Sequence, residues 1–535
     1  MQSAVTASAN SIYSGGSLGL NVQGQGMTVS VWDSGPILDT HVEFPNAKVT
    51  TLDFSATSDH GTHVMGTILA KGINQNARGL AFDANGLSYD WTNDYSEMTV
   101  AAASGLLVSN HSYWIGSGLS EWILGAYDSR AQQMDQIAYA APFYLPVVAA
   151  GNDRNNTTNP IVNTHLQNKY GYDIIRGMQN AKNSLAVGAV NNVSNYMDES
   201  SVTMSSFSSW GPTDDGRIKP EIVAKGVSVY STVADSDTSY GFKQGTSMAS
   251  PAISGVCLLL QQYYLSLNTS YMRASTLKGI LLHSAKEAGY FYGPDYEYGW
   301  GLVDVKSAAD IITKKNQALS VIEELPLSNG QVYTKTFTVS NPSNVKVSIC
   351  WTDKPAPSGL VNSGTVDPNV SYLVNDLDLK VTKTGNDYFP WSLDVNQPYA
   401  APTRTTTNNV DIFERVDIDN AVGTYTITVT HKGNIGTGQN FSLIISGLNL
   451  SLSNDEFSKD GLSIYPNPAE NLLNIQSDFD FINAKVKIFD VSGKIVYSNN
   501  DFKDNIIDIS NLLKGFYILE INNENKILTK KFIKK

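Results

Sequence analysis

Residues 1–314 alternate short apolar runs with stretches of helical periodicity, and few folds are compatible with that alternation. Four of the runs are β-rich and bounded by Gly, Asn or Asp, as buried strands are: 27–32, 106–109, 146–150 and 185–190. Helical patterns lie between them, among others at 62–71, 99–107 and 128–140. Strands that alternate with helices form parallel βαβ units, so we predict an α/β domain with a parallel sheet and helices on both faces.

The pattern changes near Lys314. A last helix at 303–314 is followed by alternation with a period of two, as in Val345, Val347 and Ile349, which is typical of strands with one buried face. We predict a β-sandwich or jelly-roll domain at 315–450. A polar stretch at 451–461 leads to a lysine-rich end with a hairpin pattern at 486–498, and we predict a small β-sandwich at 459–535.

Composition excludes several functions. The 535 residues include 37 Lys and Arg against 50 Asp and Glu, a net charge of −13, which gives no electrostatic support for nucleic-acid binding. No apolar run reaches the ~18 residues of a transmembrane helix, so we expect no membrane span. Cys257 and Cys350 are too few and too far apart for a disulfide framework or a metal knuckle.

Four short segments each end a predicted strand or begin a predicted helix: VWDSG at 31–35, DHGTHVMG at 59–66, AAGN at 149–152 and GTSMASP at 245–251. Open α/β sheets place their sites at the carboxyl ends of strands. A serine at a helix start, such as Ser247, is exposed, and its backbone N–H can stabilise a developing oxyanion. Such a serine needs a histidine base, a carboxylate to orient that base, and an amide donor such as asparagine.

Each segment alone has a simpler interpretation. An Asp after a strand is usually a turn residue or a cap, an Asn after Ala-Ala-Gly a turn residue, and a Ser at a helix start an N-cap. His60 and His63 lie one helical turn apart and could form a metal pair, although no third ligand is evident. For His63 we favour a buried packing role. If the simple interpretations all held, residues with four unrelated structural roles would have to occur by coincidence in the order Asp, His, Asn, Ser. We therefore favour a shared catalytic role for the four segments.

Together these segments resemble the signatures of the subtilisin-like serine proteases, or subtilases, over about 19–314. FSSWGP at 207–212 and IKPEIVAKG at 218–226 resemble further subtilase segments. The resemblance implies that Asp33 orients the base, His60 acts as general base and acid, Ser247 attacks the substrate, and Asn152 stabilises the oxyanion.

The resemblance also suggests a substrate groove. SNHSYWIG at 109–116 resembles the strand that pairs with the substrate backbone, which implies substrate-binding roles for Ser112, Tyr113 and Trp114, together with Ala150 and Gly151. Trp114 stands where the family usually has Gly, so we expect a narrowed pocket. Lys225 stands where Pro is common. The short loop after the His60 helix lacks the insertion that forms the strong calcium site of many subtilases, so we expect no required cofactor.

Residues 315–450 resemble the β-barrel domain that follows the catalytic domain of some bacterial alkaline subtilases, through ICWTD at 349–353 and LVNDLDL at 373–379. Asp376 and Asp378 point to the same side of a strand or loop, which suits a hard cation such as structural Ca²⁺. A solvated turn is an equally good interpretation of these two residues.

The end of the chain resembles the C-terminal sorting domain of type IX secretion, through YPNP at 465–468, IFDVSGKIV at 488–496 and KKFIKK at 530–535. An Ig-like accessory module is the alternative. The resemblance implies an exported protein, secreted or at the cell surface, that engages the type IX machinery. It also implies a signal peptide and a propeptide ahead of residue 1.

We therefore predict a secreted serine endopeptidase that acts on proteins or peptides. The alternative is a surface binding protein built on an inactive subtilase scaffold. Inactive relatives typically lose a triad residue, whereas this sequence keeps Asp33, His60, Ser247 and Asn152.

Overall fold

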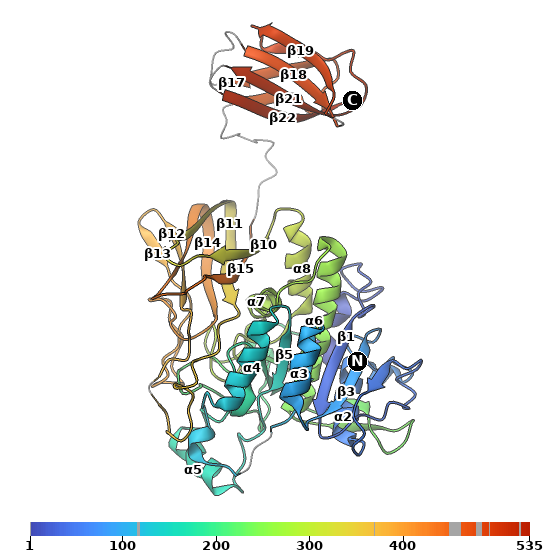
Figure 1. The fold of residues 1–535 in the computed structure, drawn as a ribbon, viewed down its shortest axis with the longest axis vertical. Coiled ribbons are helices and arrows are strands. Elements are labelled where there is room, and N and C mark those ends of the chain that lie inside the picture. The colour runs from blue at the N-terminus through green and yellow to red at the C-terminus, as the bar shows by residue number, and fades with distance from the viewer. Residues whose placement is uncertain are drawn as a thin grey trace. The chain divides into compact units, whose positions relative to one another are not determined.

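The computed structural model describes residues 2–114, 118–368, 370–448, 462–477, 484–491, 493–523 and 526–535. The chain divides into two compact units, Met1–Leu450 and Ser451–Lys535 (Figure 1). The polar stretch predicted at 451–461 lies outside the described residues. Among the helices of the described ranges, none has the length and apolar character needed to cross a membrane.

A seven-stranded parallel sheet forms the centre of the first unit, in the order β2-β3-β1-β4-β5-β6-β7. Every residue of its middle strands β4, β5 and β6 is buried, which explains the continuous apolar runs of β5 and β6. The predicted parallel α/β domain is thus confirmed. The strands are β1 (Thr28–Asp33), β2 (Val49–Thr51), β3 (Asn85–Asp90), β4 (Val108–His111), β5 (Leu145–Ala149), β6 (Leu185–Val190) and β7 (Ile222–Lys225).

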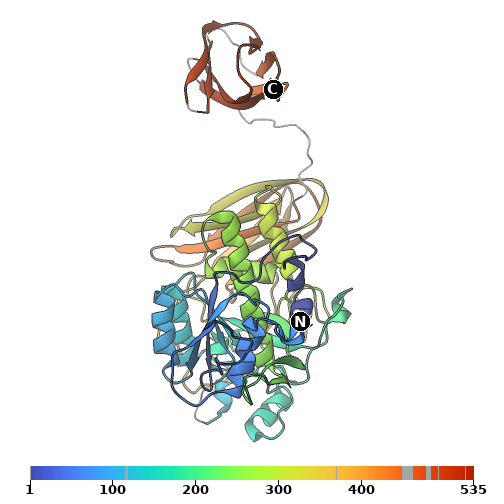
Figure 2. The same ribbon diagram turned by 90° about the vertical axis from the view of Figure 1, so that its right-hand side faces the viewer.

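Helices cover both faces of this sheet. On one face Val31 packs in a core with Val64 of α2 and Ile253 of α6, and on the other Trp32 packs with Met98 of α3 and Met134 of α4. Figure 2 shows the same layers from the side. The helices are α1 (Gln2–Thr6), α2 (Asp59–Leu69), α3 (Asp94–Ala103), α4 (Ser129–Ala140), α5 (Pro160–Asn168), α6 (Thr246–Asn268), α7 (Ala274–Ser284) and α8 (Val305–Lys315). Short 3-10 helices lie at Ala9–Ser11, Gln75–Ala77, Glu121–Ile123, Gly177–Asn180 and Glu199–Ser201.

The helix predicted at 99–107 was misplaced, since α3 ends at Ala103. Gly105 follows with a φ of 94°, a conformation that favours glycine and ends helices. Leu106 and Leu107 therefore lead into β4, which begins two residues later than the predicted strand.

Residues 321–446 form a six-stranded antiparallel sheet in the order β10-β15-β11-β14-β12-β13. Its core contains the alternating residues Val345, Val347 and Ile349, as predicted. The sheet packs on α7, where a Cβ on Gly279 would lie 2.8 Å from Ile444 and 3.1 Å from Cys350, so glycine allows the close approach. The strands are β10 (Val321–Leu327), β11 (Tyr333–Trp351), β12 (Leu377–Lys383), β13 (Asn386–Tyr388), β14 (Phe413–His431) and β15 (Gln439–Ser446).

A fully buried ion pair joins the region of the parallel sheet to the region of the six-stranded antiparallel sheet. Lys182 Nζ lies 2.5 Å from Asp353 Oδ2, and neither side chain is exposed. The same ammonium donates to the carbonyl oxygens of Lys354 at 2.6 Å and Tyr372 at 2.7 Å. Asn183 exchanges two hydrogen bonds with the backbone of Asp353. The predicted domains 1–314 and 315–450 therefore lie in one compact unit.

The second unit has a core of its own, which includes Leu473, Ile488, Leu519 and Phe532. Two antiparallel sheets form it, in the orders β16-β17-β20 and β19-β18-β21-β22. The hairpin predicted at 486–498 is confirmed as the pair β18–β19. The strands are β16 (Leu462–Tyr465), β17 (Leu472–Ser477), β18 (Ala484–Asp490), β19 (Ile495–Phe502), β20 (Ile506–Asp508), β21 (Gly515–Asn523) and β22 (Lys526–Lys534).

Candidate functional site

The four predicted segments meet at the carboxyl edge of the parallel sheet. Asp33 is the last residue of β1, Ser112 follows β4, and Asn152 lies three residues beyond β5. β1 lies between β3 and β4, where the chain changes its direction of progress across the sheet. Ligand sites of open α/β sheets form at such switch points.

Asp33 and His60 form a carboxylate–imidazole pair in which the carboxylate is buried and the imidazole is partly exposed. His60 Nδ1 lies 2.9 Å from both carboxylate oxygens of Asp33, whose side chain is 1% exposed, while that of His60 is 36% exposed. A carboxylate beside Nδ1 fixes the proton there and leaves Nε2 as the acceptor nitrogen. Nε2 of His60 is thus the nitrogen that can accept a proton from a neighbouring hydroxyl.

Ser58 holds this pair in place. It caps α2, because its Oγ accepts a hydrogen bond from the backbone N–H of Gly61 at 2.8 Å. The same hydroxyl lies 3.1 Å from Asp33 Oδ1. A Cβ on Gly61 would lie 3.0 Å from the Cβ of Asp33, so glycine after His60 lets the helix start approach the strand end.

Ser247 is the second residue of α6 and is 9% exposed. The first N–H groups of a helix have no partner within the helix. Here the N–H of Thr246 donates to Asn152 and that of Met248 to the carbonyl of Gly245. Within the described chain, the N–H of Ser247 makes no hydrogen bond, so it remains available to an oxyanion.

Ser112 and Ser247 are joined by two hydrogen bonds. Ser247 Oγ donates to the carbonyl of Ser112 at 3.2 Å, and Ser112 Oγ donates to the carbonyl of Ser247 at 3.1 Å. The second bond compensates for Pro251, which has no N–H for that carbonyl. Among the residues that the structure describes, no hydrogen bond joins Ser247 Oγ to His60.

Asn152 is fixed through its side-chain oxygen. Oδ1 accepts the backbone N–H of Thr246 at 2.8 Å and lies 3.1 Å from Thr246 Oγ1. Because a backbone N–H is always a donor, the orientation of the amide is settled, and the NH₂ group remains free to donate. Gly245, directly before Thr246, has a φ of 148°, a backbone conformation that residues with a side chain rarely adopt.

A cavity of about 310 Å³ opens beside Ser247. One wall carries Trp114, whose ring lies 4.4 Å from the guanidinium carbon of Arg176. Arg176 also pairs with Asp153 at 2.7 Å, and burial lowers its pKa. Every residue predicted to bind substrate lines this cavity, and so does the predicted oxyanion donor: Ser112, Tyr113, Trp114, Ala150, Gly151 and Asn152.

His63 is fully buried, and its Nε2 donates to the carbonyl of Val229 at 3.0 Å. Burial lowers the pKa of His63 to about 4, so the ring is neutral near pH 7. Across the described residues, one group of acidic or histidine side chains has metal-binding spacing, and it contains neither His60 nor His63. The geometry of His63 is that of a packing residue.

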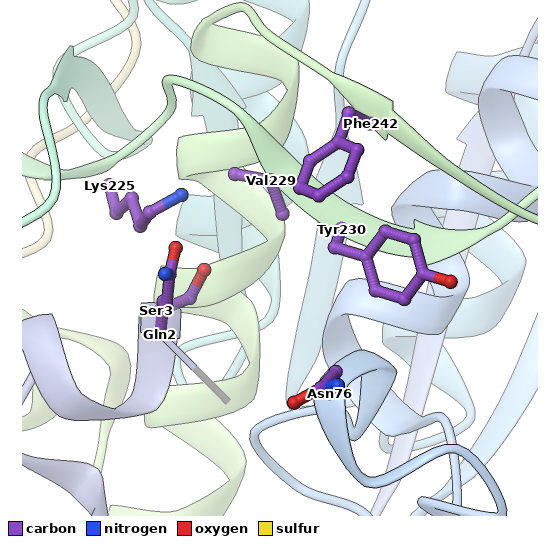
Figure 3. Close-up of a pocket in the computed structure, with 7 residues that line it drawn as sticks. All are labelled: Gln2, Ser3, Asn76, Lys225, Val229, Tyr230 and Phe242. Carbon is purple, nitrogen blue, oxygen red and sulfur yellow. The ribbon is translucent and has the colours of Figure 1, made fainter.

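Lys225 lies in a different pocket, of about 340 Å³, between α1 and the hairpin of β8 (Val229–Thr232) and β9 (Tyr240–Lys243) (Figure 3). Its ammonium donates to the carbonyls of Val227 and Ser228 at 2.6 and 2.8 Å. Burial lowers the pKa of Lys225 to about 8. Tyr230 and Phe242 form the opposite wall, with ring centroids 4.8 Å apart. None of the predicted catalytic residues lines this pocket.

A lysine lies between the two residues predicted to bind calcium. Lys432 Nζ is 3.1 Å from Asp376 Oδ2 and 2.6 Å from Asp378 Oδ1. Burial raises the pKa of Asp376 to about 6, against the opposing effect of Lys432. The ammonium of Lys432 thus already supplies a positive charge to Asp376 and Asp378. Calcium binding by these two aspartates stays a prediction.

Sequence reasoning missed several residues that shape the site. Ser58 carries a local signal, since a Ser immediately before a helix is a typical N-cap. Thr246, Arg176, Asp153 and Gln179 give no such signal, because their roles depend on contacts with residues distant in sequence. Gln179, for example, donates to the carbonyl of Tyr113 at 2.9 Å.

A parallel α/β sheet that carries a carboxylate–histidine pair and a helix-borne serine has the elements of a serine hydrolase. Residues 24–301, just over half of the chain, match the family model described as the subtilase family, and the chain therefore belongs to this family of serine proteases. Residues 463–535 match the secretion system C-terminal sorting domain, which marks a secreted or cell-surface protein.

Curated relatives include proteases from diverse organisms. The chain is 22% identical to the serine protease/ABC transporter B family protein tagD of Dictyostelium discoideum, over 85% of this chain and 32% of that protein. It is 34% identical to C5a peptidase of Streptococcus pyogenes, over 27% of this chain and 13% of that protein. It is 26% identical to an extracellular serine protease of Serratia marcescens, over 55% of this chain and 33% of that protein. The chain thus spans a third or less of these relatives.

Among solved structures, the self-cleaved protease domain of PatA covers 55% of this chain and 98% of its own, with 23% identity and a TM-score of 0.41. The prenylagaramide maturation protease PagA covers 54% and 93%, with 21% identity and a TM-score of 0.40.

Buried, neutral His63 makes the fold sensitive to acid. The folded-state pKa is about 4, whereas an unfolded histidine has a pKa of about 6.5. Between these values the unfolded state binds a proton that the folded state does not, so His63 lowers the free energy of unfolding by about 1.4 kcal/mol per pH unit as pH falls from about 6.5 to 4. We expect His63→Gln to flatten this slope in denaturant titrations. His431→Gln, at the end of β14, is the control, and an unchanged slope in His63→Gln would contradict the assignment.

Proposed function

We propose that the protein is a secreted serine endopeptidase that hydrolyses peptide bonds through Asp33, His60 and Ser247, with Asn152 as an oxyanion donor. One observation carries the proposal. The Asp33–His60 pair lies at the same sheet edge as Ser247 and Asn152, and the last two residues line one cavity. Membership of the subtilase family supports the same chemistry.

In this mechanism Ser247 Oγ attacks the carbonyl carbon of the substrate while His60 Nε2 takes the hydroxyl proton. Asp33 keeps the proton on Nδ1 and stabilises the imidazolium that forms. His60 then protonates the leaving amine, and water repeats the sequence to release the acid. The hydroxyl of Ser247 must leave the carbonyl of Ser112 to reach His60, which requires rotation about χ1 of a short side chain. Catalytic hydrogen bonds often tighten only when substrate binds.

Two donors stabilise the negative charge on the substrate oxygen. The NH₂ group of Asn152 is free because Thr246 holds its Oδ1, and the N–H of Ser247 stands at the start of a 23-residue helix. Both groups are positioned before substrate arrives, so little reorganisation accompanies charge development.

The cavity beside Ser247 is the proposed site for the side chain that precedes the cleaved bond. Trp114 forms a flat wall, and the charge of Arg176 is balanced by Asp153. An apolar or aromatic side chain fits this wall better than a charged one, because a charge would be desolvated without a free partner.

The alternative function, a surface binding protein on an inactive scaffold, is favoured by one observation, the bond from Ser247 to Ser112 in place of His60. A fluorophosphonate probe discriminates between the two functions, because it labels a serine only when a neighbouring base activates it.

We further propose that the second unit directs export through the type IX secretion machinery. The sorting-domain match covers 463–535, and the unit has its own core. An exported enzyme would encounter its protein or peptide substrates outside the cell.

Ser247→Ala tests the nucleophile. We expect loss of fluorophosphonate labelling and of nearly all peptide hydrolysis, with a small residual rate above water because the oxyanion donors remain. Ser266→Ala, in the same helix but away from the cavity, should keep both activities. Normal turnover by a folded Ser247→Ala protein would refute the triad.

Asn152→Ala tests the oxyanion donor. We expect kcat to fall by ~10²–10³ with little change in KM, because the donor acts on the transition state. Steady-state kinetics on a peptide substrate measure both constants. A raised KM with unchanged kcat would instead make Asn152 a residue that positions the substrate.

Deletion of residues 451–535 tests the sorting role. Among the residues that the structure describes, the hydrophobic cores of the first unit end at Leu448, so peptidase activity and Tm of the purified deletion protein should be nearly unchanged. In the native host the same deletion should trap the enzyme inside the envelope. Residues 459–535 fused to a periplasmic reporter should export it. Normal secretion of the deletion protein would end this assignment.

A further inference from the structure

Three aspartates from distant segments converge beside the substrate cavity. Asp173 follows α5, Asp214 follows the FSSWGP segment, and Asp367 belongs to the loop between β11 and β12. Each offers a carboxylate oxygen, and these oxygens lie within 4.8 Å of one another. This spacing suits oxygens that share one cation, since two bonds of 2.3–2.6 Å reach about as far.

Two of the oxygens are buried without a partner. Asp173 is 4% exposed, and its Oδ1 makes no hydrogen bond with any described residue. Asp214 Oδ1 is likewise buried and unpaired within the described ranges. Both atoms face the same point above Gly125, where an added Cβ would lie 2.1 Å from Asp173 Oδ1 and 2.3 Å from Asp214 Oδ1. Buried carboxylate oxygens are costly unless something binds them.

Side chains of the protein itself contact the other oxygens of these carboxylates. Lys169 pairs with Asp367 Oδ2 and lies 3.5 Å from Asp173 Oδ2. His165 Nε2 lies 3.4 Å from Asp173 Oδ2, and Asn362 Nδ2 donates to Asp214 Oδ2 at 3.5 Å. Both contacts of Lys169 are to Oδ2 atoms, so the unpaired Oδ1 atoms of Asp173 and Asp214 remain directed toward Gly125.

The charge of the cluster also calls for a cation. Burial, followed by the charges of Asp173 and Asp367, raises the pKa of Asp214 to about 9. A bound cation would offset this repulsion among the three carboxylates.

We propose that Asp173, Asp214 and Asp367 bind a divalent cation, Ca²⁺, above Gly125. The donors are all oxygens and come from three irregular segments, and Ca²⁺ accepts such irregular oxygen geometry where Mg²⁺ demands a near-ideal octahedron. This site is distinct from the Asp376–Asp378 pair, where Lys432 already lies between the carboxylates.

The bound ion would brace a wall of the substrate cavity. Asp173 directly precedes Ile174, which lines the cavity beside Ser247. Gly125 donates its N–H to the carbonyl of Ile175 at 2.7 Å, and Asp173 donates its own to the carbonyl of Gly211 at 2.7 Å. Asp367 adds a ligand from the region 315–450, so the ion would tie the β-sheet region to the segment that shapes the cavity.

The test uses the full chain carrying Ser247→Ala, which prevents self-digestion, after removal of metal with EDTA. Isothermal titration with CaCl₂ should detect binding, and Tm should rise by about 3 °C when calcium is about 100 times its Kd. Failure of this test would leave the proposed peptidase activity standing, because that activity does not require the ion.

Two isosteric variants locate the site. Asp367→Asn should abolish the Tm rise without backbone cost, because position 367 has a φ of 45°, which asparagine tolerates. Asp214→Asn should also abolish it, yet in EDTA its Tm should stay close to that of the parent, because asparagine is isosteric with the carboxyl group and carries no charge that would repel Asp173 and Asp367. A merely structural role for Asp214 would lower Tm in both conditions.

Asp376→Asn is the matched control and should keep the calcium response. The proposal is overturned if the parent binds no calcium, which would mean that Lys169 alone balances the cluster. It is also overturned if Asp214→Asn and Asp367→Asn respond like the parent, or if Asp376→Asn alone loses the response.

Discussion

The burial of helix α6 fixes most of what this protein can do. The helix contacts the parallel sheet and α2, α7 and α8, and its apolar residues Leu258, Leu259 and Leu260 are fully buried. Each such side chain stabilises the fold by about 1.5–3 kcal/mol, so the helix cannot shift along its axis without a large cost. Its first turn carries Ser247, and the position of the proposed nucleophile is therefore set by core packing rather than by a flexible loop.

The sequence allowed the positions of the proposed catalytic residues to be predicted because each one stands at a boundary with a local signal. Asp33 ends an apolar run, His60 lies in a segment that begins a predicted helix, and Ser247 begins a long apolar helix. The contacts that orient these residues could not be predicted, because they join distant parts of the chain. Thr246 fixes the amide of Asn152 across 94 residues, and Ser112 bonds to Ser247 across 135.

The same limit applied to the domain organisation. Alternating side chains were enough to predict strands at 345–351, and a helical period was enough to predict the helix before them. Nothing in either pattern indicates that Lys182 and Asp353 meet in the interior, since a charged residue in a sequence is normally expected at the surface. The misplaced end of α3 had a local cause, the positive φ of Gly105, and a glycine two residues after a helical run is a usable signal.

The buried Lys182–Asp353 pair has a consequence for how such a protein can evolve and be recombined. A buried charge that loses its partner costs several kcal/mol, so neither half of the first unit tolerates a foreign counterpart that lacks the matching residue. Exchange of modules between related proteins is therefore unfavourable at the 314/315 boundary. The viable crossover lies near residue 450, because the two units have separate hydrophobic cores as far as the described residues go. We therefore expect residues 315–450 to stay together with the α/β domain in recombination, whereas the last unit can be replaced as a whole.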